Sequence, residues 1–385
     1  MRIVLASEVY PPRAGGAGWS ARALALALRG AGHDVSVVTT SPGPADLDGL
    51  AVTRLSVAGR KRLRVPRAFA AHLAAQRDAV VHAQHSLSAL GALAGRAPGR
   101  VAVTVRDHWP VCFWSTRISG GGLCPGCGLL AMTRCVHGHV RPDALAWGAI
   151  PYMQADLLLK RRALARAGAS LAVSDAIAGE LRAAGVPRVE TIPNIVDAEE
   201  AAALARDAPS FELPERFVVF IGKLEENKGA RLLVPAVAAA GTGLPLVVLG
   251  EGTLAHTVKM DAAEAGVPLL LRGWAEREDV LRILARATAL VFPSLWPEPL
   301  SRVLLEALAL GVPIAAMETG GTAEILRPGG GLLVQDAEAL GDALRRIVSD
   351  ASLRDDLRAA ARARARAYAP AALVPRYEAV YRRLA

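Results

Sequence analysis

The chain has 385 residues, of which 52% are hydrophobic and 21% are charged, and its formal net charge is +9. This length exceeds one ordinary hydrophobic core, so we expect two α/β domains of roughly 150–200 residues each. The composition excludes intrinsic disorder, and no run approaches the ~20 apolar residues that a membrane-spanning helix needs.

The N-terminal half opens with alternating apolar and helical segments. Residues 3–6 form an apolar run, a loop rich in Pro and Gly follows over 10–18, and residues 19–29 have helical spacing before the strand at 35–39. This order predicts a βαβ unit with a glycine-rich turn after its first strand. The first apolar run is too short for a secretory signal peptide, which indicates a cytoplasmic protein.

Short apolar runs continue along the chain and alternate with helical patterns. This alternation predicts parallel sheets covered by helices on both faces. We expect an N-terminal domain over 1–196, a second domain over 197–365, and a C-terminal helix over 366–385 that packs back toward the first domain. The expected strands of the two series are 79–82, 101–105, 171–173 and 190–192, then 217–221, 246–249, 269–271, 289–292 and 314–316.

Two lysines follow the first strand of the second series. The chain has only five lysines, and Lys223 and Lys228 both lie in the segment Gly222–Gly229. Parallel-sheet enzymes bind ligands at the carboxyl ends of their strands, and a lysine is a compact charge that suits a phosphate. We therefore expect a diphosphate here, with two solvated loop lysines as the alternative.

A pair of glutamates forms the second candidate site. Glu298 follows two prolines and is expected in a loop, whereas Glu306 falls inside an apolar helix that starts near Ser301. A carboxylate in such a helix needs a hydrogen-bonding partner, either ribose hydroxyls or a backbone amide. The amides of Leu300 and Ser301 at the helix start can hold an anion.

These motifs, taken in order, resemble those of glycosyltransferase family 4 over nearly the whole chain. The resemblance implies the GT-B fold, with two Rossmann-like domains whose parallel sheets face each other across a cleft. The residues that carry it are Gly15-Gly16, Val173-Ser174 and 192–197 in the first half, then 222–229, 250–252, Gly273, 293–294, the spaced glutamates and Gly320-Gly321 in the second.

The resemblance also implies a role for each matched residue. Lys223 and Lys228 would hold the donor diphosphate, Glu306 the ribose, and Glu298 the donor sugar or its own loop. The remaining donor-binding positions are Gly222, the nucleobase neighbour Gly273, the amide donors Gly320 and Gly321, and Gly15 and Gly16, which would close over the leaving phosphate.

The reaction that the resemblance implies is sugar transfer with retention of the anomeric configuration. The donor would be a nucleoside-diphosphate sugar, and the acceptor a glycan, a lipid-linked glycan or a small molecule. No catalytic metal is expected. Two other readings remain open: an epimerase or hydrolase acting on the donor alone, and a non-catalytic nucleotide- or glycan-binding subunit of a polysaccharide-synthesis complex.

One departure from the family pattern lies after the fourth strand of the first series. Many members carry His-Asp there, whereas this chain has Arg106 followed by Asp107. Either Arg106 replaces the histidine at the donor sugar, or His108 does so through a change of register. Ser301 also stands where glycine is usual. Both changes leave the donor sugar open.

All four cysteines lie in the segment 112–139, at Cys112, Cys124, Cys127 and Cys135. One Cys-X-X-Cys pair with two flanking cysteines can bind a structural zinc ion, and we expect a glycine-rich loop without regular structure. Free thiols, disulfides and an iron–sulfur cluster are the alternatives; disulfides are uncommon in cytosolic proteins. His137 and His139 are substitute ligands.

The densest basic stretch contains Arg60, Lys61, Arg62, Arg64 and Arg67. A solvated face is the simplest interpretation, and docking to an anionic membrane surface is the second. No nucleic-acid-binding motif accompanies the stretch, so we do not expect a nucleic-acid partner. The enzyme is therefore predicted to be cytoplasmic, either free or peripheral at the inner face of the membrane.

Overall fold

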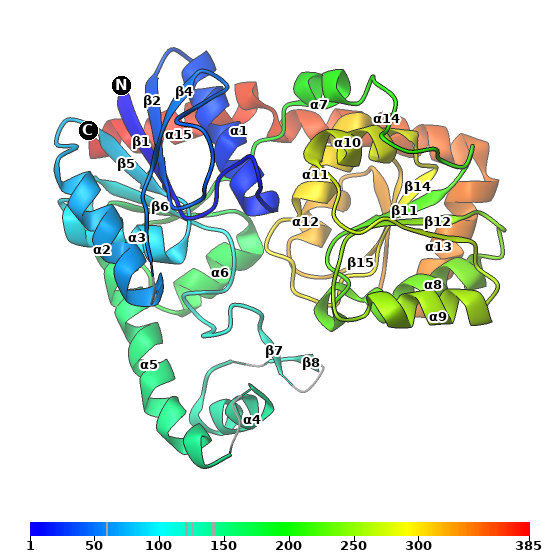
Figure 1. Ribbon diagram of the computed structural model, residues 1–385, viewed down its shortest axis with the longest axis horizontal. Helices are drawn as coiled ribbons and strands as arrows, with labels where there is room; N and C mark the ends of the chain where they lie inside the picture. Colours follow the sequence, from blue (N-terminus) through cyan, green and yellow to red (C-terminus); the bar gives the residue numbers. More distant parts are fainter. Residues whose placement is uncertain (59–60, 120–121, 125, 140–142) are drawn as a thin grey trace. The chain divides into compact units, whose positions relative to one another are not determined.

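The computed structural model describes all residues except 59–60, 120–121, 125 and 140–142 (Figure 1). The chain forms two compact units, and each is described by itself. The N-terminal unit comprises Met1–Ile195 together with Pro370–Ala385, and the C-terminal unit comprises Val196–Ala369.

Among the described residues, the N-terminal unit is built on an eight-stranded sheet with the order β10-β9-β6-β5-β1-β2-β4-β3. Neighbouring strands are parallel except β3 and β4, which form an antiparallel edge. The direction of the strand order reverses between β1 and β5. The strands are β1 (Arg2–Ser7), β2 (Asp34–Thr39), β3 (Asp46–Leu47), β4 (Leu50–Arg54), β5 (Val80–Ala83), β6 (Val101–Val105), β9 (Ala169–Ala172) and β10 (Val189–Thr191).

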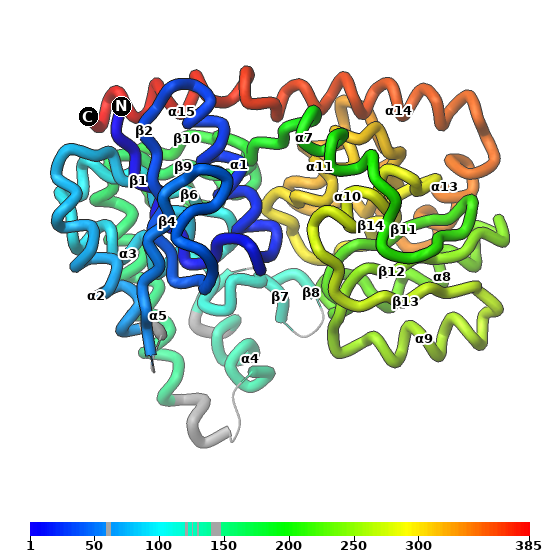
Figure 2. The backbone as a smooth tube through the Cα atoms, turned by 45° about the horizontal axis from the view of Figure 1, so that its top comes forward, coloured from blue at the N-terminus to red at the C-terminus, as the bar shows by residue number. Residues whose placement is uncertain are grey.

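Helices cover both faces of this sheet (Figure 2). On one face, α1 and α15 enclose a core with the alternate side chains of β1, β2 and β4. On the other face, α3 packs against β1, β5 and β6, and α2 and α5 pack against α3. The helices are α1 (Gly16–Gly30), α2 (Lys61–Ala74), α3 (Ser86–Gly95), α5 (Asp143–Arg166), α6 (Asp175–Ala183) and α15 (Pro370–Leu384), with a short 3-10 turn η1 (Pro98–Arg100).

Polar contacts bind the C-terminal helix α15 to the N-terminal sheet. The Tyr381 hydroxyl lies 2.7 Å from Nδ1 of the buried His82, and Nε2 of His33 lies 2.9 Å from Oε1 of Glu378. Tyr377 and Tyr381 are also fully buried in the core of this unit. The last residues of the chain thus complete the unit that the first residues begin.

Among the described residues, the C-terminal unit has one six-stranded sheet, and all its neighbouring strands are parallel. The order is β13-β12-β11-β14-β15-β16, which reverses between β11 and β14. This is the doubly wound arrangement that places ligands at the carboxyl ends of the strands beside the reversal. The strands are β11 (Val218–Ile221), β12 (Leu246–Leu249), β13 (Leu269–Leu271), β14 (Ala289–Phe292), β15 (Ile314–Met317) and β16 (Gly331–Val334).

Helices α8, α9 and α13 share a core with one face of this sheet. Helices α10 and α11 pack against each other, and α11 also contacts α7 and α14. The helices are α7 (Ala198–Leu204), α8 (Ala230–Ala240), α9 (Ala255–Glu264), α10 (Arg277–Arg286), α11 (Arg302–Leu310), α12 (Thr322–Leu326), α13 (Ala337–Ser349) and α14 (Ala351–Ala365), with 3-10 turns η2 (Glu226–Lys228) and η3 (Arg366–Tyr368).

The expectation that the cysteine segment lacks regular structure is wrong. It contains a two-stranded antiparallel hairpin, β7 (Ile118–Ser119) with β8 (Gly122–Leu123), and the helix α4 (Leu129–His139). The helix forms because Met132, Cys135 and Val136 recur at helical spacing and bury one face. Among the described helices, none is both long and apolar enough to cross a membrane.

Candidate active site

The loops that follow β11 and β14 meet at the carboxyl edge of the C-terminal sheet. These two strands pair in parallel, so their ends lie side by side. Nζ of Lys228 donates to Oε1 of Glu298 at 2.5 Å, and the Ser294 hydroxyl donates to the same oxygen at 2.7 Å. Glu298 is buried. The lysine and the glutamate predicted from separate motifs therefore form one ion pair.

Backbone contacts hold these two loops together. The carbonyl of Asn227 accepts the amides of Leu295 at 3.1 Å and Trp296 at 2.8 Å. Gly229 has a φ of +68°, and a Cβ there would lie 1.9 Å from the carbonyl oxygen of Pro293. Only glycine satisfies both conditions, so the end of the lysine loop is fixed against the start of the glutamate loop.

The two lysines of this edge differ in their surroundings. Lys228 is partly buried, and its Nζ lies 4.2 Å from the ring centroid of Trp296. Lys223 is exposed to solvent, and no carboxylate among the described residues pairs with it. One cation is thus held in place by its neighbours, whereas the other is available to an anion from solution.

Glu306 is buried on α11, as the sequence predicts, but the chain itself supplies its partners. Its Oε1 accepts from Nη1 of Arg277 on α10 and, at 2.9 Å, from Nε of Arg302 one turn earlier on α11. All three side chains are buried. Burial lowers the pKa of Arg302 to about 10, a shift that the nearby Glu306 opposes. The arginine therefore stays charged at neutral pH.

The sequence contains a signal for one of these partners. Arg302 precedes Glu306 by four residues, the spacing at which an arginine and a glutamate meet on one helix face. Arg277 comes from another helix and gives no local signal. The two arginines replace the backbone amide that the sequence alone offers as a structural partner of Glu306.

Gly320 and Gly321 lie against the backbone of the glutamate loop. A Cβ on Gly320, whose φ is +48°, would lie 2.5 Å from the carbonyl oxygen of Glu298. The amide of Gly321 donates to that carbonyl at 2.6 Å. The sequence analysis expects the Gly321 amide to bind the nucleotide-sugar donor. In the structure, this amide instead donates to the glutamate loop and holds it in place.

The other predicted backbone positions lie at loop tips and helix starts. Gly222 follows β11, and its amide donates to the carbonyl of Leu249 at 3.0 Å. Gly273 has a φ of +64° and lies beside the exposed Trp274. Helix α11 begins at Arg302, directly after Leu300 and its N-cap Ser301, and the exposed pair Gly15 and Gly16 stands at the start of α1, where no side chain caps the helix.

The carboxyl edge of the N-terminal sheet holds Arg106, at the end of β6. Its Nη1 donates to Oδ1 of Asn194 and its Nη2 to Oε1 of Gln84. Burial lowers the pKa of Arg106 to about 10, which leaves the guanidinium charged at neutral pH. Two neutral amide oxygens thus hold a cation at this edge.

The two residues after Arg106 point to different neighbours. Asp107 accepts the amide of Trp109 at 2.8 Å, and burial raises the pKa of its carboxyl group. Nδ1 of His108 lies 2.7 Å from Oε2 of Glu180 on α6, and His108 is buried there. The change of register that would bring His108 into the place of Arg106 is therefore contradicted by the structure.

Two further residues lie at this edge where β1 and β5 end, and the sequence analysis did not select them. Oε1 of Glu8 accepts the amides of Leu87 at 2.5 Å and Ser88 at 3.1 Å, at the start of α3. His85 lies 3.3 Å from the Ser7 hydroxyl through Nδ1, and burial beside Arg106 lowers its pKa to about 3. Each follows a predicted strand within a few residues, Glu8 after 3–6 and His85 after 79–82, and this position was the available signal.

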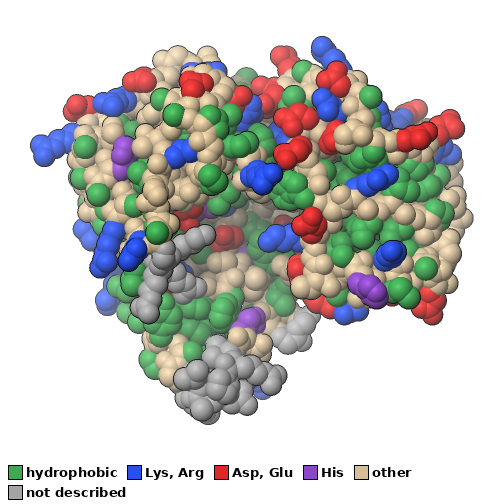
Figure 3. Space-filling view, viewed as in Figure 1, with side chains coloured by type: hydrophobic (Ala, Val, Ile, Leu, Met, Phe, Trp, Pro, Cys, Tyr) green, Lys and Arg blue, Asp and Glu red, His purple; other side chains and the backbone are tan. Residues whose placement is uncertain are grey.

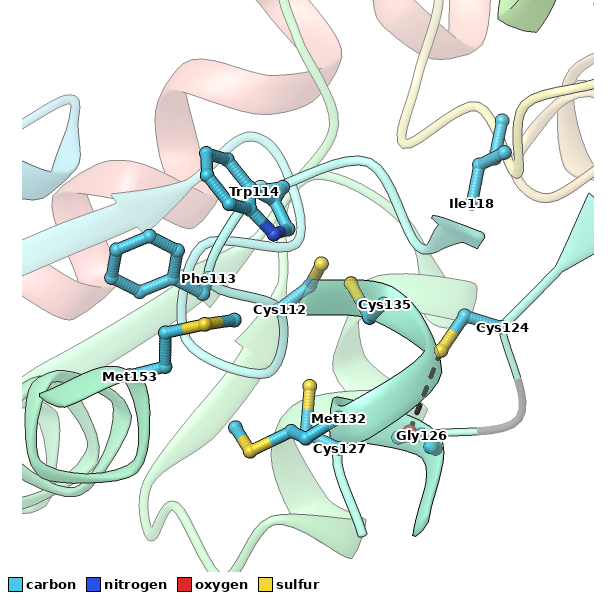
Figure 4. A pocket seen from close by; sticks show the side chains of 11 residues that line it. Cys112, Phe113, Trp114, Ile118, Cys124, Gly126, Cys127, Met132, Cys135 and Met153 are labelled. Carbon is cyan, nitrogen blue, oxygen red and sulfur yellow. Dashed lines mark hydrogen bonds between the residues drawn. The ribbon is translucent and has the colours of Figure 1, made fainter. Parts of the chain in front are cut away.

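The four cysteines line a single small cavity (Figure 4). All four are free thiols, which excludes the disulfide alternative in this structure. Among the described residues, no three His, Cys, Asp or Glu side chains are arranged as a ready-formed metal site. The segment thus gathers its cysteines but does not present a complete zinc site.

Comparison with known proteins gives the family. Residues 14–200 match the family described as "Glycosyltransferase Family 4", and residues 204–364 match "Glycosyl transferases group 1". The chain belongs to glycosyltransferase family 4. It is a glycosyltransferase that uses a nucleotide-sugar donor, and its two doubly wound units are those of the GT-B fold.

Individual relatives are similar over different shares of the chain. Glycogen synthase of Mycobacterium tuberculosis is 28% identical over 95% of this chain and 89% of its own length. A GDP-mannose-dependent mannosyltransferase of Corynebacterium glutamicum, named for a phosphatidylinositol monomannoside acceptor, is 29% identical over 46% of this chain and 51% of its own. HepE of Anabaena, solved with UDP and glucose, is 17% identical with a TM-score of 0.70, covering 98% of this chain and 99% of that one.

Proposed function

We propose that this glycosyltransferase transfers its sugar with retention of the anomeric configuration and that the edge between β11 and β14 binds the donor diphosphate. The observation that carries the assignment is the placement of Lys223 and Lys228 at the reversal of the sheet. Parallel sheets of this kind bind ligands there. Two cations at one edge match the charge of a diphosphate.

In this proposal the exposed Lys223 meets the diphosphate first. Lys228 is kept in position by Glu298 and Trp296 and turns from the glutamate toward the phosphate when the donor binds. Both lysines then stabilise the negative charge that grows on the leaving diphosphate, an electrostatic contribution that needs no rearrangement of solvent. The leaving phosphate takes the acceptor proton on the same face of the sugar, so no protein base is required.

The remaining residues of the C-terminal unit bind the rest of the donor. Oε1 of Glu306 is occupied by Arg277 and Arg302, and Oε2 accepts from a ribose hydroxyl. Gly273 borders the nucleobase. Glu298 orders the loop that contacts the donor sugar, and the amides at the start of α11 add donors to the phosphates.

The N-terminal unit is proposed to contribute contacts to the transferred sugar and the acceptor. Among the contacts of the described residues, the guanidinium of Arg106 donates to the neutral amide oxygens of Asn194 and Gln84, so its charge can also meet an anionic or hydroxyl-rich ligand. Asp107 orients the turn beside it. Gly15 and Gly16, at the uncapped start of α1, offer amides to the leaving phosphate.

Thermal unfolding against UDP, GDP, ADP, dTDP and their sugars tests the donor site. A ligand at about 100 times its dissociation constant adds about 2.7 kcal/mol to the free energy of unfolding. We expect one nucleotide to stabilise the wild type but neither Lys223→Ala nor Lys228→Ala. The exposed Lys259 on α9 supplies the matched control, because Lys259→Ala removes a lysine of the same unit outside the site.

Nucleotide binding and donor turnover by the wild-type protein distinguish the alternative functions. If no nucleotide stabilises it, the donor site is wrong and a non-catalytic subunit becomes the better interpretation. If the donor is consumed with no acceptor present, the protein acts as an epimerase or hydrolase. With an acceptor, the anomeric coupling constant of the NMR spectrum of the product distinguishes retention from inversion, and an inverted product contradicts the proposal.

We also propose that the N-terminal unit docks on an anionic membrane surface, which suits a lipid-linked acceptor. Helix α5 exposes Tyr152, Leu158 and Leu159, with 55%, 48% and 63% of their surface accessible. Arg162 and Arg166 continue this stripe at intervals of three and four residues and are also exposed. An apolar stripe with adjoining arginines is the pattern of a helix that lies in a membrane interface.

The basic stretch at the start of α2 supports the same surface. Arg64 and Arg67 are exposed beside Leu63, whereas Arg60 lies outside the described residues. In Figure 3, basic side chains gather over α2 and hydrophobic side chains lie exposed over α5. Helix α3 contacts both helices, so the two patches come from neighbouring helices of the unit.

Sedimentation with vesicles tests this docking. We expect binding to vesicles that contain anionic phospholipid and little binding to purely zwitterionic ones. The double variant Leu158→Ser, Leu159→Ser should lose the binding and keep transfer to a soluble acceptor. Met260→Ser removes an equally exposed apolar side chain from the other unit and should bind as wild type does. The proposal would be contradicted if all variants bound vesicles equally, or if the double variant changed the oligomeric state rather than the vesicle binding.

A further inference from the structure

The cysteine segment and the first half of α5 form a small lobe with its own core. Its buried hydrophobic side chains make a cluster separate from the main core of the N-terminal unit. Cores this small rarely hold a chain segment without a disulfide or a metal ion. The cluster consists of Phe113, Met132, Val136, Ile150, Met153 and Leu157, and its cysteines are all free thiols.

The four thiols of this lobe face one cavity from separate elements (Figure 4). Cys112 lies before the hairpin, Cys124 directly follows β8, and Cys127 and Cys135 lie before and within α4. A single ion in this cavity would therefore join the loop, the hairpin and the helix. The remaining described lining residues are apolar, aromatic or glycine: Phe113, Trp114, Ile118, Gly126, Ala131, Met132 and Met153.

Polar contacts in the cavity favour sulfur ligands for a metal. The amide of Arg117 donates to the Cys112 sulfur at 3.4 Å, and the Cys124 thiol donates to the carbonyl of Gly126 at 3.4 Å. Amide donors around sulfur are the outer shell that metal-bound thiolates use. All four cysteines are free thiols, so no disulfide joins the sulfurs that line the cavity.

His139, which lies beside the cysteine cluster, contacts the backbone and an aromatic ring. Nδ1 of His139 lies 2.8 Å from the carbonyl oxygen of Cys135, and the ring stacks on Trp114 with 4.8 Å between centroids. That nitrogen donates its hydrogen to the carbonyl and cannot bind a metal. The four cysteines line the cavity and neither His137 nor His139 is among its described lining residues, so the cysteines are the ligand set of the proposal.

We propose that this cavity binds one Zn²⁺ through Cys112, Cys124, Cys127 and Cys135, and that the ion draws the four sulfurs into a tetrahedron. The structure has no ready-formed arrangement of this kind among its described residues, so binding moves the sulfurs inward to about 2.3 Å from the ion. Each thiol that coordinates releases its proton to solvent, and no electron is transferred. The ion thus stabilises a lobe whose hydrophobic core is small.

Metal analysis of the full-length protein tests the proposal without any substrate. We expect about one zinc per chain after purification without chelators. After removal of zinc, added Co²⁺ should give the intense charge-transfer absorption of cobalt–thiolate bonds. Cys124→Ser and Cys127→Ser should each lower the metal content and the melting temperature, whereas Met132→Leu, at another position of the cavity wall, should keep the metal.

Other outcomes would overturn it. Four reactive thiols with no uptake of zinc or cobalt would show an ordinary thiol cluster. A mass two hydrogens lower with no metal would show a disulfide, and bound iron with labile sulfide would show a cluster of a different kind. Because metal content is measured on wild type, the test does not depend on the variants folding, and a failure of transfer activity leaves it unaffected.

Discussion

The carboxyl edges of the two sheets differ in how far the chain itself binds their polar and charged side chains. In the C-terminal unit Lys223 stands in solvent and Lys228 is partly buried. In the N-terminal unit, neighbouring amides and hydroxyls already bind Arg106, Glu8 and His85. Removing a charge that its own chain has bound lowers stability, whereas removing an exposed charge mainly changes the binding of ligands.

The C-terminal unit also contains a buried charge that its own chain binds, Glu306. Its removal should cause the largest loss of stability. Glu306→Ala removes the carboxylate that Arg277 and Arg302 share in a buried position. Breaking a buried ion pair by deleting one partner costs about 3–5 kcal/mol, because a buried charge loses its compensation. Urea unfolding at neutral pH measures the loss. An unchanged unfolding midpoint would contradict the buried pair and place Glu306 with the exposed residues of the site.

This result also changes how activity data should be interpreted. Loss of transfer in Glu306→Ala would report on folding as well as on the ribose contact. Glu306→Gln keeps the size of the side chain and a hydrogen-bond acceptor for the arginines, so it is the better variant for nucleotide binding. Its unfolding midpoint should lie between those of wild type and Glu306→Ala.

The N-terminal unit should be the more acid-sensitive of the two. Burial lowers the pKa of His82 to about 3, while the unfolded chain has a value of about 6.5. Between these values the unfolded state binds more protons, so stability falls as the pH drops below about 6.5. At pH 5 this one histidine removes about 2 kcal/mol.

Urea unfolding at pH 7 and pH 5 measures the difference. His82→Gln should lose less stability than wild type over this interval, because it has no imidazole to protonate. His72 on α2 is not fully buried, and His72→Gln serves as the control, with the same loss as wild type. Equal losses in all three proteins would show that His82 does not stay neutral in the folded unit.

Lys223→Ala should have the smallest effect on stability. Substitutions at exposed positions usually change the free energy of unfolding by no more than about 0.5 kcal/mol. The same variant should nevertheless lose nucleotide-dependent stabilisation, and its turnover should fall about 10²–10³-fold if the lysine stabilises the leaving group. Thermal unfolding with and without nucleotide measures both quantities. A large loss of stability without ligand would contradict the proposed difference between exposed charges at the C-terminal edge and bound charges at the N-terminal edge.

The sequence predicts the doubly wound fold well because buried parallel strands are short, apolar and separated by helices. It does not reveal β16, whose residues are only partly buried, or the helix α4 among the glycines of the cysteine segment. The pairing of Lys228 with Glu298 is implicit in the two motifs, since both follow strands that turn out to be neighbours. Neither motif, however, predicts the strand order that makes β11 and β14 neighbours and so brings the two side chains together.

The partners of the buried groups are harder to foresee. Arg302 could be found from its spacing to Glu306, but Arg277 comes from another helix. Likewise, the role of Arg106 depends on Asn194, which is 88 residues away in the chain. A single sequence reports local periodicity, whereas the partners of a buried charge depend on contacts that only the complete fold creates.

The return of α15 to the first sheet sets an order for synthesis on the ribosome. The C-terminal unit is continuous from Val196 to Ala369, but the N-terminal unit needs Pro370–Ala385, and His82 meets Tyr381 across 299 residues. The unit translated first is thus completed last, after its partner has emerged. Until then, the face that α15 covers stays open, and nascent chains stalled before residue 370 should be the form that chaperones retain.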